Sequence, residues 1–260
     1  MAGKHLDAER IVDTVQILGR RIRERFPEAG LNHVCADLLE IAKQARSRAE
    51  RISEPMYGIR AASCTIVSLI LLAFGYAISL IRIPDQQLRA DEFLQMLDAG
   101  FNALVLIGAS LLFLITLEIR IKRSRALKAI HELRSLSHII DMHQLTKDPE
   151  RTIWKGQDTE SSPRRNMTPF QLNRYLDYCS EMLALAGKIA ALYVENFPDS
   201  QTVAAVNDVE DLTSGLSRKI WQKIMILQET ATVEGAAKTA QKPEISGSDS
   251  PSEFAEPPVS

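Results

Sequence analysis

The sequence predicts an all-α protein with a two-helix transmembrane hairpin, cytoplasmic helical hairpins that pack as a coiled-coil-like bundle, and a disordered C-terminal tail. Three observations lead to this prediction. Two long apolar runs contain no charge, the apolar residues on either side of them recur at helical spacing, and the last part of the chain loses that spacing. The overall composition, 45% hydrophobic and 25% charged, looks globular only because it averages these different parts.

Residues 1–54 are predicted to form an N-terminal cytoplasmic helical hairpin. Apolar residues recur every three or four positions from Ala8 to Phe26, and again from Leu31 to Ile52. The FPEAG segment between these stripes contains a proline that ends a helix and a glycine that turns the chain. We therefore expect one helix on each side of this turn.

The transmembrane hairpin is assigned to residues 55–118, with spans at 61–81 and 99–117 and a short external loop at 82–98. The spans contain no Asp, Glu, His, Lys or Arg, and each is long enough to cover roughly 30 Å of hydrocarbon as a helix. The alternative is a pair of buried core helices in a soluble protein. Such helices normally carry a polar stripe, which both runs lack, so the sequence favours the membrane.

Basic residues near the spans predict the orientation. The twenty residues before the first span contain five Lys or Arg, and residues 118–137 contain six, whereas the loop at 82–98 contains two bases and four acids. Because cytoplasmic flanks are rich in Lys and Arg, both termini are expected in the cytoplasm. The same bases are expected to be solvated, with contacts to anionic lipid headgroups as the alternative.

After the second span, residues 119–146 are predicted to continue the same helix as a cytoplasmic stalk. The stretch from Glu118 to Asp148 contains neither Gly nor Pro, so nothing interrupts the helix. Residues 147–167 are rich in Pro, Gly and Ser and lack periodicity, which is typical of a linker.

Residues 168–228 are predicted to form a cytoplasmic helical pair. Its start is marked by a capping box, in which Thr168 is the N-cap and Gln171 is the third helical residue, and Pro198 separates the two helices. Residues 229–260 contain eleven Pro, Gly or Ser and six acids against two bases. This composition buries too little apolar surface to offset the entropy of ordering, so a disordered acidic tail is expected.

Sequence motifs of common enzymes are missing. The chain contains no GxxxxGK[ST] phosphate loop, no HExxH zinc motif, no GxSxG nucleophile motif and no strand-associated GxGxxG. The three cysteines are far apart and include no CxxC pair, so they indicate neither a disulfide framework nor a metal site. We expect no cofactor, and the net charge of −2 gives no indication of nucleic-acid binding.

One polar cluster stands out in the predicted stalk, in the sequence HELRSLSHIIDMHQ. Helical spacing aligns His131, Arg134, His138 and Asp141 in one row and places His143 elsewhere. The two aligned histidines are separated by about 10.5 Å of helical rise, too far to share one zinc ion. A solvated face with local ion pairs is the preferred interpretation of this histidine row. The alternatives are an interaction face between helices or subunits, and a metal or catalytic site.

Small and polar residues in the spans predict close helix packing. Residues with short side chains stand four apart, a spacing that lets two helix backbones approach, and an asparagine near the outer end can bond across an interface. Both packing within the chain and packing between chains are open. The residues are Ala73, Gly75, Ala77, Ser79, Asn102 and Gly108.

Two stretches, RRIRERFPEAGLNHVC (residues 20–35) and HELRSLSHIIDMHQLTKDPE (residues 131–150), resemble segments of uncharacterised bacterial two-span inner-membrane proteins. The arrangement of two spans flanked by cytoplasmic helices is also similar in outline to the two-transmembrane effector modules of bacterial defence systems, the SLATT class. This resemblance implies the bacterial inner (plasma) membrane as the location. It covers about a third of the chain, includes no diagnostic motif and implies no known activity.

These observations lead to three functional expectations. The preferred one is a non-enzymatic, membrane-tethered interaction or assembly module whose apolar helical stripes bind each other, a second copy or a protein partner. The second is an effector that oligomerises and then forms a pore or disrupts the membrane. The third is a membrane-bound enzyme that uses His138 and Asp141, an i,i+3 pair at chelating distance on a helix.

Overall fold

The structure, a computed structural model, describes residues 6–80, 90–147, 149, 160–161, 167–195 and 197–240. These residues form helices and no strand, which confirms the all-α prediction. The helices are α1 (Ala8–Arg25), α2 (Leu31–Ser53), α3 (Tyr57–Leu80), α4 (Ala90–Leu145), α6 (Pro169–Glu195) and α7 (Ser200–Ala240).

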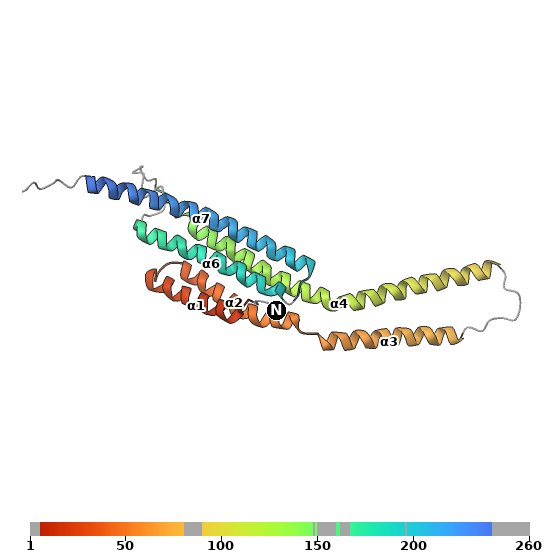
Figure 1. Ribbon diagram of the computed structural model, residues 1–260. Helices are drawn as coiled ribbons and strands as arrows, with labels where there is room; N and C mark the ends of the chain where they lie inside the picture. The colour runs from red at the N-terminus through yellow and green to blue at the C-terminus, as the bar shows by residue number, and fades with distance from the viewer. Residues whose placement is uncertain are drawn as a thin grey trace, which may run out of the picture.

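The helices form a bundle with two arms. α1, α2, α6, α7 and the second half of α4 pack together, while α3 and residues 90–117 of α4 extend from one end of the bundle (Figure 1). We refer to these two extensions as the arms. α6 is the central helix of the bundle, since it packs against α1, α2, α4 and α7.

Apolar stripes from all five bundle helices meet in one continuous core. The buried apolar residues of α4 begin at Ala126 and end at Ile140, and α6 is buried along nearly its whole length. The stripes predicted from helical spacing are therefore covered by one another within a single chain. By contrast, the most apolar part of each arm has no buried residue.

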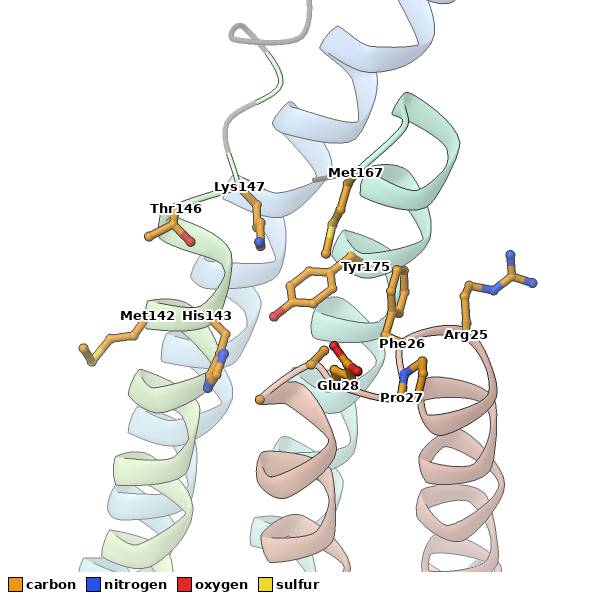
Figure 2. A pocket seen from close by; sticks show the side chains of 12 residues that line it. Arg25, Phe26, Pro27, Glu28, Met142, His143, Thr146, Lys147, Met167 and Tyr175 are labelled. Carbon is orange, nitrogen blue, oxygen red and sulfur yellow. The ribbon is translucent and has the colours of Figure 1, made fainter. Parts of the chain in front are cut away.

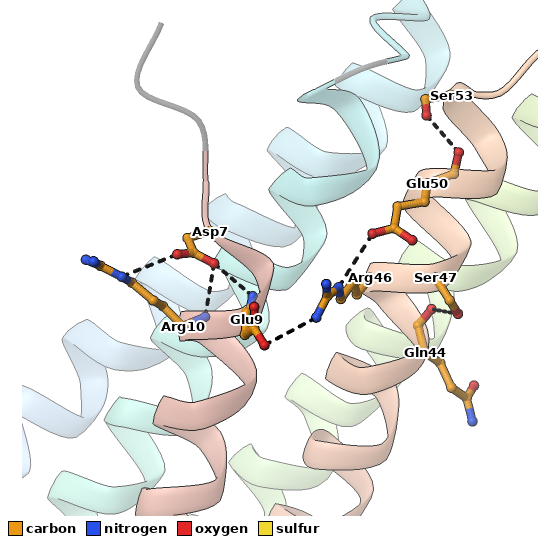
Figure 3. Close-up of polar contacts among 8 residues, drawn as sticks. All are labelled: Asp7, Glu9, Arg10, Gln44, Arg46, Ser47, Glu50 and Ser53. Atoms are coloured by element: carbon orange, nitrogen blue, oxygen red, sulfur yellow. Dashed lines mark hydrogen bonds and ion pairs between the residues drawn. The ribbon is translucent and has the colours of Figure 1, made fainter. Parts of the chain in front are cut away.

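Polar side chains fix the hairpin of α1 and α2. Asp7 is the N-cap of α1 and accepts hydrogen bonds from the backbone N–H groups of Glu9 and Arg10 at 3.0 and 3.2 Å. Figure 3 shows Arg46 of α2 lying between Glu9 of α1 and Glu50 of its own helix, at 3.7 and 3.5 Å. The side chains of Glu9 and Glu50 are both more than half exposed, so each ion pair contributes little to stability.

α4 is one unbroken helix from the arm into the bundle, as the sequence predicts. It runs through the second predicted span and the stalk without interruption and ends at Leu145, a length of about 84 Å. α4 bends where the arm meets the bundle, so its arm part and its bundle part point in different directions (Figure 1).

The start of α6 confirms the predicted capping box. The backbone N–H of Gln171 donates to Thr168 Oγ1 at 3.2 Å, and the backbone N–H of Thr168 donates to Gln171 Oε1 at 2.9 Å. α7 is capped by Asp199, whose Oδ2 accepts from the backbone N–H of Thr202 at 3.2 Å.

Two predicted boundaries differ from the structure. α4 begins at Ala90, inside the predicted loop at 82–98, because no Pro or Gly follows Pro84 in that loop and its acidic residues suit the first turn of a helix. α7 continues beyond Gln228 to Ala240, because the start of the predicted tail is rich in alanine and its first proline is Pro243. Residues 81–89, most of the linker at 147–167 and the tail after Ala240 lie outside the described residues.

Candidate functional site at the junction of the arms and the bundle

The arms have the properties required of membrane-crossing helices. Two helices of the chain are long and apolar enough to cross a membrane. In a soluble protein a helix of this composition would be buried, yet large apolar side chains along both arms are exposed, among them Leu72, Tyr76, Leu106 and Ile115. An exposed apolar surface of this extent is typical of a membrane or protein interaction site.

A polar cluster closes the bundle end of both arms and centres on Glu118. Arg60, at the start of α3, donates from Nε to Glu118 Oε2 at 2.6 Å and from Nη2 to Oε1 at 3.3 Å. The backbone N–H of Met56 donates to Glu118 Oε1 at 3.2 Å, and Lys122 Nζ lies 3.0 Å from the same oxygen. Four donors on one carboxylate fix the two arms to each other at this level.

The same contacts control the protonation state of Glu118. The hydrogen bonds from Arg60, together with those from Lys122 and the Met56 backbone, lower the pKa of the Glu118 carboxyl to about 2, although its partial burial acts in the opposite direction. The side chains of Glu118 and Lys122 are only 12% and 9% exposed. Glu118 therefore carries a negative charge throughout the physiological pH range.

A second ion pair connects α4 to the turn between α6 and α7. Arg123 donates from Nη2 to Asp199 Oδ1 at 2.6 Å and from Nε to Oδ2 at 2.9 Å, a bidentate arrangement. Arg123 and the Thr202 groups lower the pKa of the Asp199 carboxyl. Because Asp199 also caps α7, the long helix of the arm is linked to the first turn of α7.

A largely apolar cleft lies between the arms, just beyond this polar cluster. It has a volume of about 710 Å³, and its walls include Cys64 and Val67 of α3, Leu114 and Ile119 of α4, and Phe197. The arms do not close against each other above it.

The small residues of the arms do not bring α3 and α4 together. A Cβ atom built on Gly75 or Gly108 would meet no atom within 4 Å, and Ala73 and Ala77 are exposed. Ser79 donates to the carbonyl oxygen of Tyr76 in its own helix, and Asn102 donates to Asp98 one turn away. In the structure the arms stay apart at these levels (Figure 1), so Gly75 and Gly108 show no packing against the other arm. Packing between chains stays a prediction.

The histidine row lies on the outer surface of α4. His131, Arg134 and His138 are exposed, and Asp141 is half-buried. Among the described residues no ion pair joins Arg134 to Asp141, and the Asp141 carboxylate accepts a hydrogen bond from Gln144 Nε2. Within the described residues, no three His, Cys, Asp or Glu side chains are grouped so that they could hold a metal ion.

The two stretches that carry the sequence resemblance meet at the far end of the bundle. A pocket of about 700 Å³ lies between the α1–α2 turn, the end of α4 and the start of α6, and Figure 2 shows its side chains. Tyr175 packs edge-on against Phe26 at 5.5 Å between ring centroids, and Lys147 Nζ lies 5.4 Å from the Tyr175 ring centroid. His143, which the sequence placed outside the histidine row, packs directly against Gly30 in the wall of this pocket: a Cβ atom built on Gly30 would come within 2.8 Å of the imidazole ring.

Two of the cysteines are unreactive core residues. Cys35 and Cys179 are buried, and burial raises the pKa of their thiols to about 11 and about 12. At neutral pH both remain protonated, so neither is a nucleophile.

The polar cluster at Glu118 is absent from the predictions made from the sequence, although the sequence contains a signal for it. Arg60 immediately precedes the first span and Glu118 immediately follows the second, so a hairpin of two spans places them at the same level. The pair of Arg123 and Asp199 had no such signal, because the chain between them folds back through all of α6.

Searches of protein-family models, curated proteins and solved structures find no match to this chain.

Proposed function

We propose that this chain is a non-enzymatic, membrane-tethered assembly module of the bacterial inner membrane, with the arms in the bilayer and the bundle in the cytoplasm. One observation carries the proposal, namely that two helices, each with a charge-free apolar run whose side chains are exposed, extend from a bundle whose own core is closed. The excess of Lys and Arg at the bundle ends of both arms supports the orientation.

The closed core limits the surfaces through which the module could bind a second copy or a partner. The apolar stripes that the sequence offered to a partner are already covered within the chain. Association with a second copy or a partner would therefore use the arms, the histidine row or the polar surface of the bundle.

Labelling of introduced cysteines with a membrane-impermeant maleimide tests the topology. Cys35 and Cys179 are buried and give no signal, so the background needs only Cys64→Ser. In intact spheroplasts we expect Gln95→Cys, near the tip of the arms, to be labelled and Ser135→Cys, on the outer face of the bundle, to be labelled only after permeabilisation. Both positions are exposed on the protein, so a difference in their labelling reports on which side of the membrane each one lies. Labelling of Ser135→Cys from outside would contradict the proposed orientation.

A second candidate function is an oligomerising effector that permeabilises the membrane. It is favoured by the open space around Gly75 and Gly108, since small residues that pack nothing within the chain leave a surface for another helix. The outline similarity to two-transmembrane effector modules points the same way.

The two candidates differ in liposome leakage. For the effector, we expect dye release and chemical crosslinking between copies, and Gly108→Leu should reduce both because it blocks backbone approach. Ala103→Leu is the matched control, since position 103 lies about 140° away around the helix. Oligomers without leakage would favour the assembly module. Leakage that is unaffected by Gly108→Leu would show that helix packing at the small residues is not needed for permeabilisation.

A further inference from the structure

A basic cleft lies between the last turns of α2 and the part of α4 that follows the arm. Its volume is about 370 Å³. Buried Ile52 and Ala129 line it together with five charged side chains, and only one of the five is acidic. The charged residues are Arg48, Arg51, Arg125, Lys128 and Glu132.

The acid in this cleft is already neutralised. Arg48 Nη1 donates to Glu132 Oε2 at 2.7 Å, and Arg48 Nη2 donates to Gln44 Oε1 at 2.6 Å. The side chains of Arg48 and Glu132 are each about one-third exposed. This pair therefore forms a fixed, electrically balanced wall of the cleft.

The other three bases have no such partner. Arg51, Arg125 and Lys128 are exposed, and no ion pair joins any of them to an acid in the described part of the chain. Three cations thus converge from two helices on one concave site without a matching anion. Arginine and lysine in this arrangement are typical of phosphate recognition, in which guanidinium groups bind two oxygens at once.

The position of the cleft indicates where the phosphate comes from. Arg125 lies eight residues beyond Leu117, the last residue of the apolar run, or about 12 Å along the helix. Side chains on a helix lean toward its N-terminus, which for α4 means toward the arms, so Arg125 reaches back to the level of the headgroups. Arg51 lies at the end of α2 from which the arms leave the bundle (Figure 1).

We propose that this cleft binds the phosphate of an anionic phospholipid headgroup in the cytoplasmic leaflet. The inference rests on the proposed anchoring of the arms in a bilayer. Each base near an anionic surface contributes about a factor of five in affinity, so three bases give a preference of about 100-fold over a zwitterionic lipid. A lipid bound there would contact α2 and α4 together and would set the depth of the bundle at the membrane.

The experiment measures lipids retained by the full-length protein. The protein is reconstituted into nanodiscs of phosphatidylcholine with and without phosphatidylglycerol, extracted, and analysed by native mass spectrometry. Phosphatidylglycerol should be strongly enriched on the wild-type protein relative to its share in the bilayer. The triple variant Arg51→Gln, Arg125→Gln, Lys128→Gln should lose at least tenfold of this enrichment.

A charge-matched control separates the cleft from general electrostatics. Arg20→Gln, Arg218→Gln and Lys219→Gln together remove the same charge from exposed positions elsewhere on the bundle, so this variant should keep the enrichment. If both triple variants lose it equally, the cleft is not the site. Should the cleft variant melt below the wild type by circular dichroism, the single variants Arg125→Gln and Lys128→Gln replace it, each with a several-fold loss expected.

Two further measurements distinguish a lipid from a soluble phosphate, and lipid binding in the cleft from anchoring of the arms. Inorganic phosphate and glycerophosphoglycerol are added as soluble competitors, and binding of either at least as tightly as the lipid would overturn the lipid assignment. Flotation with phosphatidylcholine vesicles after carbonate washing reports anchoring alone. Protein that floats without enriching phosphatidylglycerol refutes this inference and leaves the anchoring intact, whereas protein that does not float refutes both.

Discussion

At the scale of single residues, Glu118 is a nearly buried carboxylate that is held by four donors. It lies where an apolar arm ends, and it is bound by Arg60 from the other arm and by Lys122 from its own helix. A carboxylate removed from water in this way is stable only while its donors remain, so the three residues depend on one another.

Glu118 should make the stability of the protein depend on pH. Its pKa in the folded protein is lowered to about 2 from an ordinary 4.5, so its contribution is complete above pH 4.5 and is lost as the pH falls toward 2. Glu118→Gln should lower the free energy of unfolding by about 1–2 kcal/mol at pH 7, discounted for the exposure of Arg60, and should flatten the acid side of the pH profile. Thermal melts in detergent across this range measure both effects.

The control for this prediction is Glu50→Gln, which removes an acid that is 65% exposed and lies 3.5 Å from Arg46. We expect a change of less than about 0.5 kcal/mol. If Glu118→Gln were as mild as Glu50→Gln, the polar cluster would not hold the arms together.

At the scale of helices, α6 organises the bundle. Four helices pack around it, and its first turn is satisfied by the reciprocal hydrogen bonds of Thr168 and Gln171. Because α6 contacts every other bundle helix, fraying of its first turn should weaken its packing against its neighbours.

Removal of the cap should therefore destabilise the bundle. Thr168→Ala is expected to cost about 1 kcal/mol of unfolding free energy, because the N–H of Gln171 loses its acceptor. Thr168→Ser keeps the hydroxyl and should cost only a few tenths. Chemical denaturation of both variants in the same detergent measures the difference, and equal losses would show that the methyl group of Thr168, not the cap, matters.

At the scale of the whole molecule, the chain is a closed bundle connected to two arms through one continuous helix. Hydrogen exchange should reveal this division. We expect the slowest exchange in α6, since opening it requires separating it from four neighbours. Mass spectrometry of peptides after exchange in detergent provides the test. Slower exchange in α1 than in α6 would contradict the central place of α6.

The arms should respond to their surroundings in the same experiment. Their backbone hydrogen bonds are internal to the helices, so exchange in α3 should slow when detergent is replaced by a bilayer, while α6 should remain unchanged. Equal protection in both media would argue against insertion of the arms.

Local sequence patterns were enough to predict the helices, the arms and the cap of α6. Helical periodicity, charge-free length and capping are local properties, readable within a few turns of chain, and α1, α2, α4 and α6 begin or end close to where these signals place them. The errors at Ala90 and Gln228 were at helix ends, where no residue breaks the helix and neighbouring conformations differ little in energy.

The contacts between distant charged residues depend on how the helices pack. The ion pairs of Arg48 with Glu132 and Arg123 with Asp199 join residues 84 and 76 positions apart, and the packing of helices brings each pair together. The same packing placed the histidine row on the outside, left Gly75 and Gly108 without a neighbour, and gathered Arg51, Arg125 and Lys128 on one cleft. Periodicity specifies the face on which a residue lies, but what that face meets depends on helix order and rotation, which are properties of the assembled core.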